Sequence, residues 1–412
     1  MLVTCFVIQS VAQHIPVQQC WIVRVHMELV EIKKKMAALV VDCGSGVTKA
    51  GVAGDDAPRS IIPTILGRPK HELQILGGQI KSHFVGDEVR SKRGILNISH
   101  PIQYGTIENY EDMSSLLAHI FYNDLQIAPE EQCILLTQPL FNKLECRNKM
   151  KQILFEEFGV PGLYFEEQAV LAMYSSGRTT GISVGCGEGL TQVLSVYEGY
   201  GVTGAQLKTN VAGASVTNFL GKLLTQRGHY FTTGAEIENL REMKEKTCYV
   251  ALDYEDNMNA SSNVDATSEL EYHLPDGTVV TLGCETFQSA ELLFHPEMGG
   301  FESLGIHEMV FESATRSDID LRRDLYSSVV LSGGSTNLNG FAKRLKWELD
   351  KRVPISCKVR VVECFQDNMD PSIMSWIGGS ILASLACFQQ KWLSKVEYDE
   401  CGPSVTSGRK RF

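Results

Sequence analysis

The chain has 412 residues, of which 43% are hydrophobic and 21% charged, and its formal net charge is −11. This length and composition are typical of a globular protein with a large core and two or more domains, and the negative charge argues against a nucleic-acid groove as the main function. The twelve cysteines form no CxxC pair and no Cys/His cluster at metal-ligand spacing, which indicates reduced cysteines in a cytosolic protein.

Residues 1–35 differ from the rest of the chain. They are apolar on average, but Gln9, Gln13 and Pro16 interrupt the apolar run, so they would make a poor membrane helix. No basic stretch precedes the apolar part, as it would in a signal peptide. We expect an N-terminal extension that is disordered, specific to one lineage, or an artefact of an upstream start codon, and a globular part that begins at Met36.

The first informative stretch is a predicted β-hairpin at residues 37–52. An apolar run reaches Asp42, the tip contains Gly44 and Gly46, and a second strand-like run follows. Glycine lets the backbone turn tightly and point its N–H groups at an anion such as phosphate. The hydroxyl of Ser45 and the charge of Lys49 suit the same ligand, although an ordinary polar hairpin explains this stretch equally well by itself.

The same pattern occurs a second time at residues 183–192. Both copies read Val-x-Cys-Gly-x-Gly-apolar-Thr, and a strand-like run follows each of them. The long spacing indicates duplication of a whole domain rather than a repeat array. Two such hairpins could hold a phosphate chain from both sides of a cleft. The copies differ at one important position, because Gly185 stands where the first copy has Asp42.

Between and beyond the hairpins, helix-like spacing of apolar residues alternates with short apolar runs, which predicts an α/β chain. We expect a strand at residues 133–137 and helices at residues 111–125, 143–158, 168–176, 213–227 and 235–248. Residues 250–268 should be an exposed connection, residues 271–282 a hairpin, and residues 294–306 an exposed apolar loop. Residues 71–83 form either a mobile surface loop or an apolar finger offered to a partner.

A third glycine motif lies near the C-terminal end. A predicted buried strand at residues 329–332 leads into Gly333 and Gly334, and a helix is expected at residues 340–350. Such a strand–turn–helix unit can present backbone N–H groups at a helix start to a phosphate or sugar. One glycine turn is common in proteins, whereas three in one chain favour a nucleotide site.

The sequence resembles the actin family over residues 36–412. The segments that carry the resemblance include ALVVD (38–42), KAG (49–51), GDDAPR (54–59), VGDE (85–88), SKRGIL (91–96), SGRTTGI (176–182), KEK (244–246), WIGGSILASL (376–385) and EYDE (397–400). The resemblance implies the actin/Hsp70/sugar-kinase fold, with two duplicated α/β domains. The outer domain would comprise residues 36–175 and 369–412, with subdomain 2 at about 64–100, and the inner domain residues 176–368, with subdomain 4 at about 212–301.

The resemblance also implies a central cleft that binds ATP or ADP with Mg²⁺, or with Ca²⁺ in its place. Asp42 would hold the cation through water, and Gln168 would position the attacking water. The residues implied to surround the nucleotide are Gly44, Ser45, Gly46, Val47, Lys49, Gly187, Glu188, Gly189, Gly213, Arg241, Lys244, Glu245, Gly333, Gly334 and Ser335.

Several positions depart from the family pattern at this cleft. Gly185 replaces a second cation-anchoring Asp, Gln192 replaces a histidine that assists the water, and Glu188 replaces another Asp. Mg²⁺ usually binds through one or two carboxylates and several waters, so the loss of one carboxylate weakens its site. Because misplaced water and lost proton handling lower rates by orders of magnitude, we expect slow or absent ATP hydrolysis with nucleotide binding retained.

The family assembles into filaments, and the resemblance extends to the surfaces involved. Ile75 and Leu76 match a loop that inserts into a neighbouring subunit, and Tyr174, Ile377, Ile381 and Leu385 match a groove for that loop or for actin-binding proteins. Tyr104, the pair Ala214–Ser215 and the pair Met298–Gly299 depart from the family at assembly surfaces, and residues 363–373 lack a Lys-Tyr pair that packs on adenine.

Three functions follow from this comparison of residues. The first is a cytoplasmic cytoskeletal protein that forms filaments alone or with conventional actin. The second is a monomeric adaptor in a larger complex that uses ATP structurally. The third, a sugar kinase or Hsp70-type enzyme, is disfavoured because the resemblance covers actin surface segments and no sugar-binding constellation is visible. The retained finger and groove favour the filament.

Overall fold

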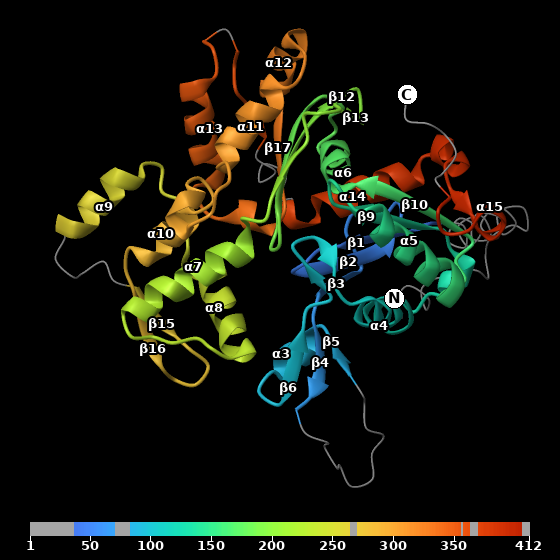
Figure 1. Cartoon of the computed structure of the whole chain (residues 1–412), viewed down its shortest axis with the longest axis horizontal. Helices are drawn as coiled ribbons and strands as arrows, with labels where there is room; N and C mark the ends of the chain where they lie inside the picture. Colours follow the sequence, from blue (N-terminus) through green and yellow to red (C-terminus); the bar gives the residue numbers. More distant parts are fainter. Residues whose placement is uncertain (1–36, 71–82, 264–269, 356, 363–369, 406–412) are drawn as a thin grey trace, which may run out of the picture.

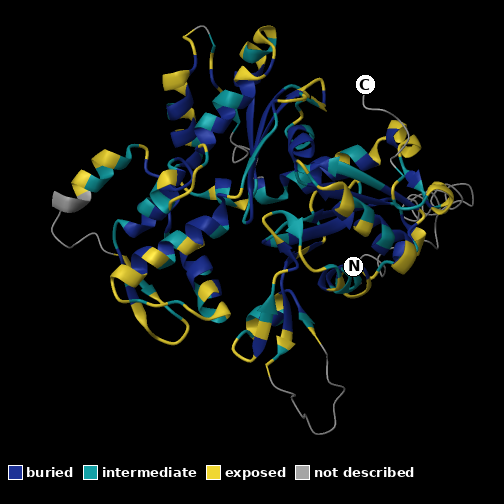
Figure 2. Ribbon diagram, in the orientation of Figure 1, coloured by how far each residue is buried: buried dark blue, intermediate teal, exposed yellow. Residues whose placement is uncertain are grey.

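The computed structural model describes residues 37–70, 83–263, 270–355, 357–362 and 370–405. The predicted N-terminal extension, residues 71–82 of the finger predicted at 71–83, and residues 363–369 lie outside the described residues. Two six-stranded sheets occupy the two halves of the molecule, with helices packed against each of them (Figure 1). Buried residues are concentrated in these strands and in the helix faces that contact them (Figure 2).

The first sheet contains the first glycine hairpin. Its strands lie in the order β19-β10-β9-β1-β2-β3. β1 pairs antiparallel with β2, with Asp42 opposite Lys49, and pairs parallel with β9. The bounds are β1 (Leu39–Cys43), β2 (Val47–Val52), β3 (Ser60–Pro63), β9 (Ile134–Gln138), β10 (Gly162–Glu167) and β19 (Leu393–Ser394). The predicted hairpin and the strand expected at residues 133–137 are therefore confirmed.

The second sheet repeats this arrangement around the second hairpin. Its strand order is β13-β12-β11-β17-β18, with β14 also paired to β12. β11 pairs antiparallel with β12, with Gly185 opposite Gln192, and parallel with β17. The bounds are β11 (Gly181–Cys186), β12 (Thr191–Tyr197), β13 (Tyr200–Gly201), β14 (Leu207–Thr209), β17 (Val329–Ser332) and β18 (Val361–Val362). A hairpin with a parallel third strand thus occurs twice, as the duplication predicts.

The helices expected from apolar spacing are all present. α4 (Tyr110–Ala118) and α5 (Leu144–Gln152) each continue into a π-helical stretch, His119–Leu125 and Ile153–Glu157, and α6 spans Gln168–Ser175. In the second half, α7 (Gly213–Gln226) and α8 (Gly234–Thr247) are followed by α10 (Glu285–Glu291), α11 (Ile306–Thr315), α12 (Ile319–Tyr326) and α13 (Phe341–Arg352). α14 (Met374–Ser384) and α15 (Lys395–Cys401) end the described chain.

Helices α6 and α14 join the two sheets. α14 packs on β1, β2 and β9, whereas α6 packs on β11, β12 and β17, and the two helices cross each other. Gly378 of α14 lies so close to the carbonyl oxygen of Leu171 in α6 that a Cβ at Gly378 would overlap it. Trp376 is fully buried and donates its indole N–H to the carbonyl of Val40 at 3.0 Å. This crossing fixes the relative positions of the two hairpins.

Two smaller units flank the hairpins. One is the three-stranded sheet β5-β4-β6 (Phe84–Val85, Leu66–Pro69, Leu96–Ser99) with the short helix α3 (Asp87–Ser91). The other combines α7, α8 and α10 with the hairpin β15–β16 (Leu270–His273, Val279–Leu282). The short hairpin β7–β8 (Ile102–Gln103, Thr106–Ile107) connects the first unit to α4.

Two local predictions need correction. The connection expected at residues 250–268 contains a helix, α9 (Tyr254–Asn263), whose start is capped by the Asp253 carboxylate accepting from the N–H of Asp256 at 3.1 Å. The loop at residues 294–306 exposes Phe301, but its ends, Phe294 and Ile306, are buried. The helix expected at residues 340–350 is present as α13, and a 3₁₀ turn (Gly334–Asn337) lies between it and the third glycine turn.

Candidate functional site

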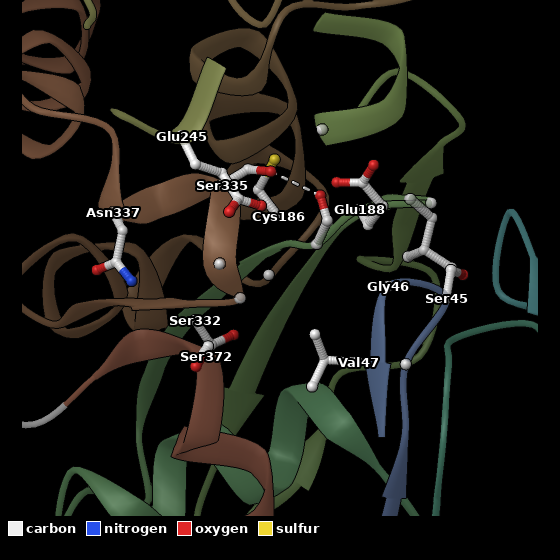
Figure 3. Close-up of a pocket in the computed structure, with 18 of the residues that line it drawn as sticks. Ser45, Gly46, Val47, Cys186, Glu188, Glu245, Ser332, Ser335, Asn337 and Ser372 are labelled. Carbon is white, nitrogen blue, oxygen red and sulfur yellow. Dashed lines mark hydrogen bonds between the residues drawn. The ribbon is translucent and has the colours of Figure 1, made fainter. Parts of the chain in front are cut away.

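The tips of the two glycine hairpins approach each other closely at the wall of a cavity of about 610 Å³ (Figure 3). A Cβ added to Gly46 would lie 2.8 Å from the Cβ of Glu188, and one added to Gly189 would overlap the side chain of Ser45. Only glycine therefore allows this close approach. The cavity volume lies within the range of small-molecule and cofactor sites.

All residues predicted to form the site line this one cavity. They come from β1, β2 and α6 on one side, and from β11, β12, α7, α8 and the turn after β17 on the other. The predicted residues at the cavity wall are Asp42, Gly44, Ser45, Gly46, Val47, Lys49, Gln168, Gly185, Gly187, Glu188, Gly189, Gln192, Gly213, Arg241, Lys244, Glu245, Gly333, Gly334 and Ser335.

Asp42 is the acidic centre of the first hairpin. One carboxylate oxygen, Oδ1, accepts from Thr137 Oγ1 at 2.5 Å and from Gln168 Nε2 at 2.9 Å. The other oxygen, Oδ2, accepts from Lys49 Nζ at 3.2 Å. Asp42 is 2% exposed, and a buried carboxylate needs such partners to remain charged. The ammonium of Lys49 lies at the cavity wall, where it can also bind an anion.

Gln168 is held from the opposite side by Gln192. Gln192 donates from Nε2 to Gln168 Oε1 at 3.2 Å and accepts from the backbone N–H of Leu140 at 3.0 Å. The side-chain amide of Gln168 therefore has protein partners at both its oxygen and its nitrogen. A glutamine held in this way has fewer free groups with which to position a water molecule.

The second hairpin carries an acidic group of its own, although not at the position of Asp42. Glu188 accepts from Lys244 Nζ at 3.3 Å, and Lys244 also donates to the carbonyl of Gly213 at 3.0 Å. Burial opposes the charge of Glu188, but Lys244 and Arg241 outweigh it and lower the pKa of the carboxyl group. At this end the wall of the cavity thus combines Glu188 with the cations Lys244 and Arg241, and Arg241 also pairs with Glu245.

The third glycine turn completes the wall. Gly333 has a φ of 88°, and a Cβ there would overlap the backbone of Cys186, so the position requires glycine. Ser335 donates its hydroxyl to the carbonyl of Gly187 at 2.8 Å, which ties the turn to the second hairpin (Figure 3). Asn337 follows at the same edge of the cavity, and its side chain donates to Asp370 at 2.8 Å.

Among the residues of the site that the sequence analysis missed, three contact or approach the hairpins from other elements. Thr137 lies near the end of β9 and binds Asp42 of the neighbouring β1, and the shared edge of two parallel strands could have indicated it. Gly105, in the β7–β8 turn, donates its N–H to Ser45 Oγ at 3.1 Å. Arg90 reaches the cavity from α3. No sequence signal connects the last two to the hairpins, because their approach depends on how the small sheet folds over the cleft.

The site offers several groups that can bind a nucleotide's phosphates, but few side chains that can bind its divalent cation. Phosphates need a positive charge, N–H donors and room for a close approach. Lys49 provides the positive charge, the glycine tips provide N–H groups, and Gly213 leaves room for a close approach. Among the described residues no group of three or more His, Cys, Asp or Glu side chains could hold a metal ion. A divalent cation would therefore depend on Asp42, water and phosphate oxygens, an arrangement that Mg²⁺ accepts.

Fold and site together define a duplicated α/β protein with a cavity between two glycine hairpins. The family model described as Actin matches residues 33–411, nearly the whole chain. The chain belongs to the actin family, and its mixed α/β architecture is that of the actin ATPase fold. Members of this family generally bind ATP or ADP with a divalent cation. In the part of the chain that the structure describes, none of the helices has the length and apolar character needed to cross a bilayer.

Proposed function

We propose that this chain binds ATP or ADP with Mg²⁺, or with Ca²⁺, in the cavity between the hairpins. The observation that carries the proposal is the opposition of the two glycine tips, Gly46 against Glu188 and Ser45 against Gly189. Phosphates would lie against these tips and Lys49, and the nucleoside against Gly213, Lys244 and the third glycine turn. When bound, the cation would neutralise phosphate charge, and Asp42 would hold it through water.

Hydrolysis in this site should be slow. Gly185 supplies no carboxylate to the cation, and the side chain of Gln192 holds Gln168 instead of assisting a water molecule. Gln168 also donates to Asp42 and to Thr137, so it would have to leave these partners to orient an attacking water. We infer a protein that retains nucleotide for long periods and turns it over rarely.

We further propose that the protein is cytoplasmic and cytoskeletal and forms filaments by itself or with conventional actin. Ile381 and Leu385 are exposed at the end of α14, while Ile377 is nearly buried and Tyr174 half-buried, so the edge of the predicted groove is accessible. The domain boundaries proposed from sequence, 36–175 with 369–412 and 176–368, place one hairpin in each domain. A monomeric adaptor role is the alternative, favoured by the departures at Ala214, Ser215 and Met298.

Two measurements on the purified full chain test the proposal. Nucleotide released by acid and separated by chromatography should be ATP or ADP, and protein without bound nucleotide that also fails to bind added Mg-ATP would contradict the cavity assignment. A pelleting assay in Mg²⁺ and KCl, alone and mixed with conventional actin, separates the two structural roles. Sedimentation in either mixture supports the filament, and a soluble monomer in both supports the adaptor.

A further inference from the structure

The end of the cavity away from the tip of the first hairpin is formed by two segments that meet at a backbone contact. The last turn of α8 contributes Glu245, and the segment after the third glycine turn contributes Asn337 and Asn339. The backbone N–H of Val250, just beyond α8, donates to the carbonyl of Asn339 at 2.8 Å. Figure 3 shows Glu245 and Asn337 on the side of the cavity opposite the first hairpin. A nucleotide with its phosphates at the hairpin tips would therefore place its base among these three residues, which we call the base end.

The base end offers no aromatic ring on which a base could stack. Among the described residues that line the cavity there is no Phe, Tyr, Trp or His. Stacking on a ring tolerates any base, because every base has a π-face. Hydrogen bonds to the edge of a base depend instead on where that base carries donors and acceptors. The described part of this site must therefore recognise a base mainly through its polar side chains.

Glu245 is the charged acceptor of the base end. Its Oε1 accepts from Nε of Arg241, four residues earlier in α8, at 3.1 Å, and its Oε2 has no hydrogen-bond partner among the described residues. The Glu245 side chain is 55% exposed, so Oε2 can meet a ligand while the ion pair stays intact. A carboxylate can only accept hydrogen bonds, and this oxygen therefore suits a base that presents donors.

Asn337 provides a second acceptor, because its amide is held in one orientation. Its Nδ2 donates to Oδ1 of Asp370 at 2.8 Å. Burial opposes the charge of Asp370, but hydrogen bonds from Ser372 and Asn337 outweigh it and lower the pKa of the carboxyl group. Since a carboxylate only accepts, the nitrogen of Asn337 must face Asp370, which leaves the amide oxygen available to a ligand. Asn339 is exposed beside it and can either donate or accept.

The two purines present different donors to such a surface. The pairing edge of guanine carries two adjacent donors, N1–H and the 2-amino group, beside the acceptor O6, whereas adenine carries one donor, its 6-amino group, beside the acceptor N1. Acceptors on Glu245 and Asn337 can meet both donors of guanine. With adenine, one of them would face the N1 acceptor without a hydrogen bond, and an unmatched polar group of this kind lowers affinity.

We propose that the base end selects guanine, so that the chain binds GTP or GDP at least as tightly as ATP or ADP. The inference rests on the proposed nucleotide function and deepens it, since it names the base that the cavity prefers. Glu245 and Asn337 accept from the donors of guanine, and the amide of Asn339 can donate to O6. None of these three residues belongs to the glycine turns that hold the phosphates.

The test measures displacement of mant-ADP from the purified full chain in Mg²⁺ by unlabelled nucleotides, followed by fluorescence. GTP should displace the probe at a concentration equal to or below that required of ATP. ITP keeps N1–H and O6 but lacks the 2-amino group, so it should bind about two- to fivefold more weakly than GTP, the loss of one partly solvated hydrogen bond. Tighter binding of ATP than of GTP would overturn the inference.

Two variants identify the residues that read the base. Glu245→Gln replaces one acceptor oxygen by a donor, and Asn337→Leu removes the amide. Each should lower the affinity for GTP about three- to tenfold more than the affinity for ATP. The matched control is Glu312→Gln on α11, because Glu312 also pairs with the Nε of an arginine four residues away, Arg316 at 2.9 Å, but does not line the cavity. It should leave the ratio of the two affinities unchanged.

The ratio of the GTP and ATP affinities separates base selection from a general loss of folded protein, which lowers both affinities alike. A ratio in Glu245→Gln and Asn337→Leu equal to that of the Glu312→Gln control would overturn the selection of guanine and leave the cavity assignment standing. A wild-type chain that binds neither mant-ADP nor unlabelled GTP or ATP would overturn the proposed nucleotide function as well.

Discussion

Gln192 donates a hydrogen bond to Gln168 at 3.2 Å across the cleft, from the second hairpin to the start of α6. The oxygen of the same Gln192 side chain accepts from the backbone N–H of Leu140 at 3.0 Å. Gln168 in turn donates to Asp42. The residues that should perform hydrolysis are instead linked in one hydrogen-bonded chain, which supports a site built to hold nucleotide.

Restoring the missing groups should restore turnover. Gly185→Asp returns a carboxylate, and Gln192→His removes the amide that holds Gln168, so we expect the double variant to release phosphate at least about tenfold faster. A Cβ at Gly185 would lie 3.2 Å from Gln192 Cγ and 3.3 Å from Ser332 Oγ, so the single Gly185→Asp variant should gain less. Phosphate release in polymerisation buffer measures this, and an unchanged rate in the double variant would contradict our account.

Removal of the positive charge of Lys49, at the first hairpin, should weaken nucleotide binding. Lys49 lies at the cavity wall and is only 8% exposed. Lys49→Met keeps the length of the side chain but loses its charge, and we expect Mg-ATP affinity to fall more than about tenfold, the loss of one charge-assisted interaction. Calorimetric titration measures the affinity. Lys343→Met, on the exposed face of α13, is the control and should bind normally; equal affinities for the two variants would argue against a phosphate at Lys49.

The crossing of α6 and α14 should be intolerant of a single methyl group. Gly378→Ala would place Cβ against the carbonyl of Leu171, and we expect a loss of about 1–3 kcal/mol in the free energy of unfolding. Gly94→Ala is the matched control, since nothing lies within 4 Å of a Cβ built there. Urea denaturation of both variants gives the comparison. A loss no larger than that of the control would mean that the two helices can separate at little cost.

His307 should make the protein sensitive to mild acid. Burial, followed by the charge of Arg352, lowers the pKa of His307 to about 4, and its Nδ1 is buried without a partner among the described residues. The unfolded chain binds this proton below about pH 6.5 and the folded chain does not, so stability falls as the pH drops from 6.5 towards 4. Between pH 7.5 and pH 5 this amounts to about 2 kcal/mol.

Thermal unfolding as a function of pH checks this contribution. His307→Gln should flatten the decline between pH 6.5 and pH 5, because the uncharged amide takes up no proton. His229→Gln, at a half-buried position after α7, should leave the decline as it is in the wild-type chain. A His307→Gln variant with the full wild-type slope would place the acid sensitivity elsewhere.

The sequence predicted the parts of the site that depend on local backbone chemistry. Glycines at Gly44, Gly46, Gly187 and Gly189 indicated two turns, and apolar alternation indicated the strands that hold them, so the facing hairpins followed from the duplication. The prediction for residues 250–268 failed because α9 is polar, and none of its residues from Tyr254 to Ala260 is buried. Its start signal is one capping residue, Asp253, and its main anchor is Tyr254, 6.0 Å from the ring of Phe287.

The sequence pattern could not predict contacts between residues that lie far apart in the chain. The bond between Gln192 and the Leu140 backbone spans 52 residues. The ion pair between Arg90 Nε and Glu238 Oε2, at 3.7 Å, joins the small sheet unit to α8. The 3₁₀ turn after Gly334 is stabilised by contact with the segment around Pro371, which accepts the N–H of Gly333 at 2.8 Å, and a distant segment leaves no mark on local periodicity.

The bond from the Trp376 indole to the Val40 carbonyl spans 336 residues, and it has a consequence for how a newly made chain matures. The strand β1 leaves the ribosome early, whereas the helix that covers it is translated almost last. Until then one apolar face of the nascent sheet stays open to solvent and to other chains. We therefore expect the first sheet to complete its fold only after α14 has been translated. Polypeptides truncated before α14 should accumulate as insoluble or degraded material.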